Sequence, residues 1–239
     1  MIVHNNTKAL NVMAVVTARG GSKGLPNKNV LDFCGKPLIA WSIDAAKNSK
    51  HVDRVVVSTE DDNIAKVARA YGADVPFMRP DELATDEAVT LDVLKHLVSK
   101  IQDYDLIVLL QPTSPLRIAQ DIDTAIELCA SNAMTSIVSV CEADKSPFWM
   151  YYLSGEGEME NVLTANQASS TRRQDLPQAY ALNGAVYVIS KDALQAGEAL
   201  VSKNTLAFRM PKSRSVDIDS KEDFVVAEAL WAFSQNSEQ

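Results

Sequence analysis

The sequence predicts an α/β fold, a layered domain built on a mostly parallel sheet. Short β-branched runs alternate with amphipathic helical stretches over residues 12–141, and the connections between them are short. This alternation is typical of strand–helix–strand units with parallel strands. One run, Asp105 to Leu110, is almost wholly apolar, as expected for a strand in the middle of a sheet that is covered on both faces.

The elements are predicted in order from their periodicity and end signals. Pro37 is well placed in the first turn of a helix, and Gly72 suits the end of another. A strand also closes the stretch at 183–188. We expect strands at residues 12–17, 54–58, 74–78, 105–110 and 135–141, and helices from Pro37 onward, at 61–71, at 87–101, near 121–130 and after Ser220.

Length and composition indicate one domain with an appendage. The chain has 239 residues, of which 46% are hydrophobic. We expect a single domain at residues 11–239, an excursion at 145–180 and a polar lead-in at 1–10. A net charge of −8 argues against nucleic acid or an anionic membrane as a partner. No run approaches the ~20 apolar residues of a membrane span.

The cysteines are consistent with a reducing compartment. Cys34, Cys129 and Cys141 form no Cys-x-x-Cys pair, so zinc or disulfide roles are not expected. We therefore predict a cytoplasmic protein.

The most informative stretch is the loop after the first strand. The run Val12 to Thr17 breaks into a loop with three glycines, Ser22 and the cations Arg19, Lys23 and Lys28. Glycines let successive backbone N–H groups point at one oxygen cluster, so the loop is a candidate anion cradle. Its spacing fits neither the P-loop nor the Gly-x-Gly-x-x-Gly fingerprint. The alternative is a solvated glycine-rich turn.

Loops that leave successive strands should meet at one edge of the sheet. Ligands of parallel α/β sheets bind beyond the carboxyl ends of the strands. The segments at 17–24, 58–60, 79–80 and 111–117 should therefore converge, and three of them carry arginine or lysine with hydroxyls or amides. We expect a polar, cationic cleft there.

The segment Gln111 to Arg117 contains two prolines, which make it a rigid shelf for Gln111, Thr113 and Ser114. The alternative is an ordinary proline-rich connection in which Arg117 pairs with an acidic neighbour.

Residues 145–163 leave the regular alternation. They hold a cluster of aromatic residues and a Ser154 to Gly157 turn, which predicts a hairpin. A hairpin this aromatic has little core of its own, so it packs on a partner surface or on its own chain. Arg172 and Arg173, further along, suit a carboxylate or phosphate, or else form a solvated basic turn.

Two aspartates precede the last helix. In a strand, Asp217 and Asp219 would point to the same face with Ile218 buried opposite. Paired carboxylates need a cation, and hard oxygen ligands suit Mg²⁺. Alternatively, one of them caps the helix at Ser220.

Several of these motifs resemble one family over almost the whole chain. Four motifs carry this resemblance: Ala-Arg-Gly-Gly-Ser-Lys-Gly at 18–24 with Asn-Lys-Asn at 27–29, Leu-Gln-Pro-Thr-Ser-Pro-Leu-Arg at 110–117, the Arg-Arg-Gln stretch with its later Tyr180 and Asn-Gly-Ala, and Val-Asp-Ile-Asp at 216–219. They are similar to the motifs of the CMP-sialic acid synthetases (N-acylneuraminate cytidylyltransferases), including relatives that activate legionaminic acids. The resemblance implies a three-layer Rossmann-like nucleotidyltransferase domain with a dimerisation hairpin, acting as a homodimer.

It also implies a reaction: Mg²⁺-dependent joining of CTP and an acidic nine-carbon sugar, such as N-acetylneuraminate, to give the CMP-sugar and pyrophosphate for lipopolysaccharide or capsule. By the same resemblance, the expected residues are Arg19, Lys23, Lys28 and Asp217 for catalysis; Arg19, Gly20, Ser22, Lys23, Asn29 and Arg79 for the nucleotide; Gln111, Thr113, Ser114, Arg172, Arg173, Tyr180 and Asn183 for the sugar; and Asp217 and Asp219 for the metal.

Two alternatives stay open. Thr85 to Thr90 departs from the hydroxyl-rich run common in sialic acid members, and Ser146 to Trp149 is similar to legionaminic acid relatives, which use CTP or GTP. The opening motif differs from that of the Kdo activators. The other alternative, from a different class, is a catalytically idle sugar-nucleotide sensor.

Overall fold

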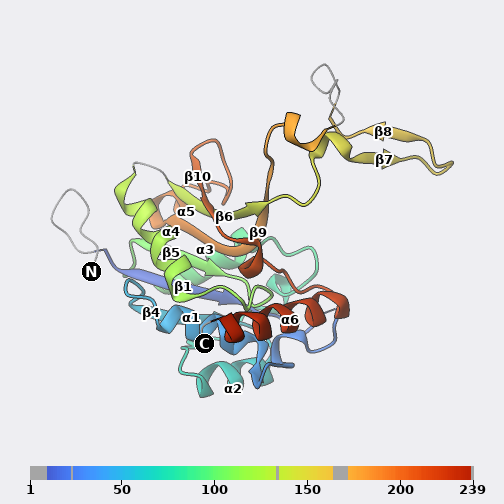
Figure 1. Cartoon of the computed structure of the whole chain (residues 1–239). Coiled ribbons are helices and arrows are strands. Elements are labelled where there is room, and N and C mark those ends of the chain that lie inside the picture. The colour runs from blue at the N-terminus through green and yellow to red at the C-terminus, as the bar shows by residue number, and fades with distance from the viewer. Residues whose placement is uncertain (1–9, 23, 133–134, 164–171, 238–239) are drawn as a thin grey trace.

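The computed structural model describes residues 10–22, 24–132, 135–163 and 172–237, without the side chains of Arg173 and Ser237. Its centre is a six-stranded sheet in the order β10-β6-β9-β5-β1-β4, in which only β9 runs against its neighbours. The strands are β1 (Val12–Thr17), β4 (Arg54–Ser58), β5 (Leu106–Leu110), β6 (Ser136–Glu142), β9 (Tyr180–Ser190) and β10 (Thr205–Arg209). The predicted mostly parallel α/β sheet is confirmed (Figure 1).

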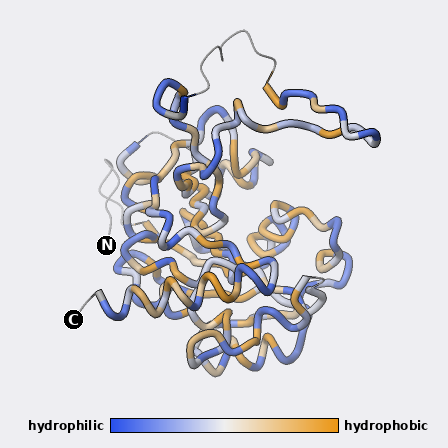
Figure 2. Tube along the Cα trace, turned by 45° about the vertical axis from the view of Figure 1, so that its right-hand side comes forward, coloured by the Kyte–Doolittle hydropathy of each residue, from blue (hydrophilic) through white to orange (hydrophobic). Residues whose placement is uncertain are grey.

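Helices cover both faces of the sheet. Alternate residues of β1 point to opposite sides: Ala14 packs in a core with α1, α2 and α4, and Met13 packs in a second core with α3 and α5. In Figure 2 the helices alternate between orange and blue, as amphipathic helices do. The helices are α1 (Leu38–Lys47), α2 (Asp62–Ala70), α3 (Thr90–Lys100), α4 (Ala119–Ser131), α5 (Lys191–Gln195) and α6 (Lys221–Ser237).

A third, aromatic cluster fastens α6 to the body. Phe33 contacts Phe224 and Trp41 edge to face, with ring centroids 5.4 and 5.8 Å apart. Ile218 is fully buried in this cluster. The segment on which the two aspartates lie is thus anchored by its central residue.

Short elements complete the fold: β2 (Asp32–Phe33), β3 (Lys36–Pro37), and the 3-10 turns η1 (Lys28–Val30), η2 (Asp81–Leu83), η3 (Pro147–Trp149), η4 (Arg173–Asp175) and η5 (Lys212–Arg214).

The structure corrects two predicted strands. At residues 74–78 only Asp74 makes a parallel bridge, to Val56, because Pro76 has no N–H to continue the pairing. Residues 215–219 form no strand, although Ile218 is buried as expected. The predicted elements omit β2, β3, β10 and α5. The end of α2 agrees with the prediction, since Gly72 has the positive φ of +83° that favours glycine after a helix.

The excursion is a projecting hairpin. Strands β7 (Tyr151–Leu153) and β8 (Met159–Asn161) pair antiparallel and extend away from the body (Figures 1 and 2). Its apolar side chains are exposed, Leu153 by 69%. In the described part of the chain, no helix has the length and apolar character to cross a membrane.

Candidate active site

A cavity of about 610 Å³ opens beyond the carboxyl ends of β1 and β5. Three of the four loops expected to converge line it, at 17–24, 79–80 and 111–117, together with residues 83–93 and the two aspartates. The lining residues are Thr17, Arg19, Ser22, Gly24, Lys28, Asn29, Arg79, Leu83, Thr85, Asp86, Ala88, Thr90, Val93, Gln111, Pro112, Thr113, Asp217 and Asp219.

The fourth loop, at 58–60, does not line the cavity, but its Glu60 carboxylate binds two residues of the neighbouring loops. Glu60 Oε1 accepts a hydrogen bond from the Gly20 backbone N–H at 2.7 Å, and its Oε2 pairs with Arg79 Nη2 at 2.6 Å. The same Arg79 nitrogen donates to the Ala18 carbonyl oxygen, and Arg79 is only 6% exposed. Two groups assigned to the nucleotide thus bind Glu60, which shapes the glycine-rich loop from behind.

Lys28 ties the glycine-rich loop to the acidic segment. Its Nζ donates to the Ile218 carbonyl at 2.7 Å and to Asp219 Oδ1 at 2.9 Å, and the residue is buried. Gly24 lies so close to the same segment that a Cβ there would overlap the Asp219 carbonyl oxygen. The sequence brings two distant stretches into contact through one lysine and one glycine.

Arg19 pairs with an acid at the mouth of the cavity. Its Nη1 lies 2.5 Å from Asp86 Oδ1, and both side chains are 34% exposed. Asn29 donates to the Arg19 backbone carbonyl at 2.9 Å, which positions the loop while Asn29 itself lines the cavity.

The described part of the predicted cationic cleft is charge-balanced, and because Lys23 is not described, the cationic character of the whole cleft stays a prediction. Among the described lining residues, three cations, Arg19, Lys28 and Arg79, are balanced by Asp86, Asp217 and Asp219. The residues attract an anion only when a carboxylate moves aside or a further cation joins them. Lys23, expected in this loop, lies outside the described residues.

Gln111, Thr113 and Asp217 meet on one wall. A Cβ on Gly184 would lie 2.6 Å from Gln111 Oε1 and 3.5 Å from Asp217 Oδ2, so both side chains lie against the Gly184 backbone. The Ile218 N–H donates to the Thr113 carbonyl at 2.8 Å. Gly184 has a φ of +70°. At this position both the backbone conformation and the close approach require glycine.

Asp217 opens onto the cavity, yet the surrounding protein perturbs it. Partial burial, with smaller contributions from the charges of Asp219 and Asp223, raises the pKa of Asp217, while a hydrogen bond from Thr113 opposes the rise. Asp223 has a different role. Its carboxylate accepts from the Ser220 N–H and hydroxyl at 2.8 and 2.7 Å. Asp223 thus caps α6, and Asp217 and Asp219 remain in the cavity.

The two cavity carboxylates fit Mg²⁺. The described residues contain no group of three His, Cys, Asp or Glu side chains that would form an all-protein metal cage. Mg²⁺ is commonly bound by one or two carboxylates together with substrate phosphates and water. Partial burial, and after it the charge of Asp219, raises the pKa of Asp217, and a bound divalent cation would favour the charged form of this carboxylate.

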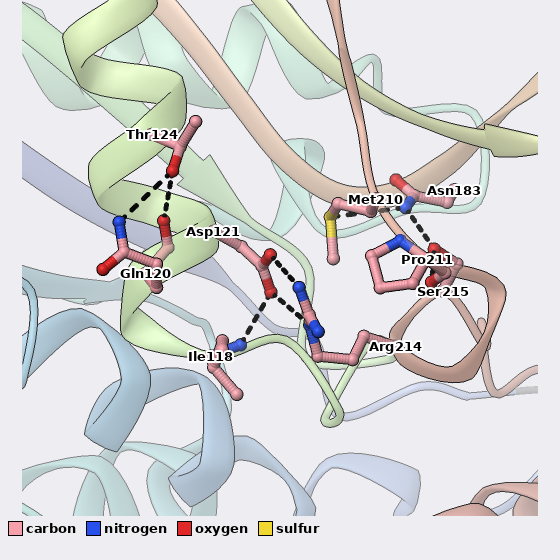
Figure 3. A network of polar contacts seen from close by, with 9 residues as sticks. All are labelled: Ile118, Gln120, Asp121, Thr124, Asn183, Met210, Pro211, Arg214 and Ser215. Atoms are coloured by element: carbon pink, nitrogen blue, oxygen red, sulfur yellow. Dashed lines mark hydrogen bonds and ion pairs between the residues drawn. The ribbon is translucent and has the colours of Figure 1, made fainter.

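Two residues assigned to the sugar have internal roles instead. Ser114 is fully buried and donates to the Asn183 carbonyl at 3.3 Å. The Asn183 side chain accepts from Ser139 Oγ at 2.6 Å. It also donates to Ser215 Oγ at 2.8 Å (Figure 3). Neither lines the cavity, because their hydrogen bonds hold them in the interior, where Ser114 is 0% and Asn183 4% exposed.

The remaining assigned residues lie away from the cavity. Arg172 and Tyr180 do not line it, and the Tyr180 ring lies under the guanidinium of Arg209 at 4.7 Å. The side chain of Arg173 lies outside the described part of the chain. Arg117, whose role the motif left open, is buried and donates to the Ala185 carbonyl, Ser42 Oγ and the Gln111 carbonyl. It supports the shelf from inside.

The sequence interpretation missed Glu60 and Asp86 as members of the site. Both are carboxylates in segments that follow or face strand ends, which was the available signal.

A mostly parallel sheet with a glycine-rich loop and two acidic side chains at its carboxyl edge is the architecture of nucleotidyltransferases. The chain belongs to the cytidylyltransferase family, whose model matches residues 13–238. The resemblance found in the motifs is thereby confirmed at the level of the family.

Individual relatives narrow the comparison. The chain is 37% identical over 215 residues to an N-acylneuraminate cytidylyltransferase of Streptococcus agalactiae serotype V, covering 89% of this chain and 51% of that protein. It is 34% identical over 233 residues to a CMP-N,N'-diacetyllegionaminic acid synthase of Legionella pneumophila, covering 95% and 99%. The chain thus spans about half the length of the streptococcal relative.

Among solved structures, a CMP:2-keto-3-deoxy-manno-octonic acid synthetase in complex with CTP superposes with a TM-score of 0.72 at 19% identity, covering 94% of this chain and 99% of that one. At this identity the likeness concerns the fold.

Proposed function

We propose that the protein joins CTP and a nonulosonic acid to give the CMP-sugar and pyrophosphate. The anomeric hydroxyl oxygen forms a bond to the α-phosphorus of CTP, the bond from that phosphorus to the bridging oxygen breaks, and pyrophosphate leaves with the electron pair. The hydroxyl proton passes to water.

The observation that carries this proposal is the charge balance of the cavity. Arg19 and Lys28 line it beside Ser22, yet each cation already faces a carboxylate. A triphosphate entering this cavity needs additional positive charge, and Asp217 with Asp219 provides a place to hold it. Mg²⁺, when bound, would supply charge neutralisation at the phosphates.

The chain's own residues would then perform three tasks. Arg19, Ser22 and Lys28 bind the phosphates, Asn29 and Arg79 keep the glycine-rich loop and its walls in place around the nucleotide, and Gln111 with Thr113 orients the sugar. Fixing the two reactants in line replaces a slow encounter with an oriented one. Lys23 also belongs to the proposed phosphate site.

One observation favours a legionaminic acid as the sugar. The match to the Legionella relative extends over 99% of that protein, whereas the match to the streptococcal relative covers only 51% of it. A legionaminic acid is therefore the second candidate substrate beside N-acetylneuraminate.

Pyrophosphate release tests the reaction. CTP and GTP are each combined with N-acetylneuraminate, a legionaminic acid and Kdo, with Mg²⁺ and with excess EDTA. We expect release with CTP and one nine-carbon acid, lost in EDTA. Binding of CTP without release in any combination would contradict catalysis and favour the idle sensor.

We further propose that the hairpin joins two copies of the chain. Tyr151, Tyr152, Leu153 and Met159 all expose apolar surface on a two-stranded ribbon that has no core of its own. Arg172 and Tyr180 lie at the base of this excursion, so they reach the partner's cavity in the proposed homodimer. Cytoplasmic location fits the three free thiols and remains part of the proposal.

The oligomeric state tests this arrangement. Leu153→Asp should shift sedimentation from dimer to monomer at micromolar protein, because a charge replaces an apolar side chain in the interface. Glu156→Gln in the turn is the matched control and should stay dimeric. A monomeric parent protein would contradict the proposal.

A further inference from the structure

Asp217, which lines the cavity, lies on a segment without regular structure. Residues 215–219 follow the turn η5 and precede α6, and they pair with no strand. The place of Asp217 therefore depends on side-chain and backbone tethers rather than on a sheet. The Ile218 N–H bond to the Thr113 carbonyl, 2.8 Å long, secures it on one side.

On the other side, Arg214 secures the segment through a carboxylate. Arg214 Nη2 lies 2.8 Å from Asp121 Oδ1, and its Nε lies 3.0 Å from Oδ2, so the guanidinium binds both oxygens (Figure 3). Such two-point pairing fixes orientation as well as distance. Only two residues separate Arg214 from Asp217, which leaves little slack.

Asp121 is itself immobilised. It is 2% exposed, lies in the first turn of α4, and its Oδ2 also accepts from the Ile118 N–H at 3.0 Å. Ile118 directly follows the shelf that contains Gln111 and Thr113. One carboxylate thus connects the shelf, the start of α4 and the segment on which Asp217 lies.

A neighbouring ion pair shows what an ordinary tether looks like. Lys212, in the same turn as Arg214, pairs with Asp144 at 2.6 Å, and both side chains are well exposed. That pair lies in solvent, and neither residue lines the cavity. Surface pairs of this kind contribute little.

We propose that Arg214 and Asp121 are a positioning pair that sets the Asp217 carboxylate against Thr113 and Gln111 for nucleotidyl transfer. The pair touches neither substrate and acts through the two residues that link Arg214 to Asp217. This inference rests on the proposed function, in which Asp217 holds the divalent cation.

The conservative variant Arg214→Lys tests the pair, because it keeps the charge and loses the two-point contact. Lys212→Met is the matched control from the same turn, and Asp217→Asn reports on the site itself. Three quantities are measured for each: the Mn²⁺ dissociation constant of the protein alone by water-proton relaxation, the CTP dissociation constant without metal, and kcat with KM for CTP.

For Arg214→Lys we expect a loss of about tenfold or more in kcat and a similar weakening of Mn²⁺ binding, as for other residues that orient metal ligands. CTP binding without metal should stay within about twofold, since the phosphate loop is untouched. Lys212→Met should match the parent protein in all three.

Two results would overturn the inference in distinguishable ways. If Arg214→Lys lowers only the melting temperature and equals Lys212→Met in Mn²⁺ affinity and kcat, the pair is structural and the positioning role is wrong. If Asp217→Asn leaves Mn²⁺ affinity unchanged, the metal assignment within the proposed function fails first, and the positioning role falls with it.

Discussion

Two arginine–carboxylate pairs of this protein differ in how deeply the carboxylate is buried and in what the pair faces. Arg214 binds both oxygens of the buried Asp121 beneath the cavity. Arg19 pairs with Asp86 at the cavity, and both side chains are one-third exposed. The Asp121 carboxylate is 2% exposed and also accepts from the Ile118 N–H, whereas Arg19 and Asp86 line the cavity that a ligand would fill.

The contrast shows how charged residues that hold the fold together can be distinguished from those that are available to a ligand. A carboxylate with all its bonds inside the protein holds elements together, and removing it leaves a charge unmatched. A carboxylate with one solvent-facing contact can exchange that contact for a substrate at small cost. Asp121 and Glu60 thus support the site from within the protein, whereas Asp86 and Asp217 line the cavity itself.

The largest effect is expected at Asp217, where the supported segment meets the cavity. Asp217→Asn should lower kcat by about 10²- to 10³-fold, the loss typical of one group that stabilises charge in a transition state. CTP binding without Mg²⁺ should change little, because the phosphate loop stays intact. Pyrophosphate release and a CTP titration measure the two. Asp223→Asn, which alters the cap of α6, should retain kcat, and equal losses in both variants would break the distinction.

The second effect compares the stability of the two pairs directly. Asp121→Ala should lower the free energy of unfolding by about 2–4 kcal/mol, since a helix cap and a charge-assisted pair are lost together. Asp86→Ala should cost less than about 1 kcal/mol, as exposed ion pairs do. Urea unfolding of both variants measures the difference. Similar values for the two would show that burial does not separate these pairs.

The fold was predictable where local pattern and tertiary packing agree. The β-branched run at 12–17 is a central strand, and the loop after it lines the cavity, as predicted. Both features were predictable because each depends on residues that are adjacent in the sequence. The strand predicted at 74–78 does not form beyond the bridge at Asp74, because Pro76 interrupts the pairing. The prediction gave the apolar pattern of this stretch more weight than the proline.

The site was less predictable, because a motif does not say which way its side chains point. Ser114 and Asn183 lie in motifs that resemble the family, yet both are buried and bonded to other parts of the interior. The pairing of Glu60 with the Gly20 N–H spans 40 residues, so only the folded chain reveals it. The sequence shows Asp86 as part of a departure from the hydroxyl-rich run, but it does not show that Asp86 pairs with Arg19.

The third effect concerns how closely the loop approaches the acidic segment. Gly24→Ala should lower kcat at least tenfold, because the new Cβ would overlap the Asp219 carbonyl and push the loop away. Gly21→Ala is a matched control: a Cβ there meets nothing within 4 Å. Neither glycine has a positive φ, so backbone strain does not confuse the comparison. Steady-state kinetics of the two variants measure it, and equal activity would show that the contact is slack.

The smallest effect is expected at the mouth of the cavity, and it has the opposite sign. Asp86→Asn should tighten CTP binding by about twofold to fivefold, because the Asp86 carboxylate no longer competes with the phosphates for Arg19. An ion pair whose side chains are one-third exposed contributes under about 1 kcal/mol, so the gain is small. The gain should shrink at high salt, which screens the competing carboxylate. Glu87→Gln removes the same charge one residue further on and should change affinity less. Weaker CTP binding in Asp86→Asn would mean that this carboxylate serves the bound nucleotide, and Asp86 would then join Asp217 among the groups that act on the ligand.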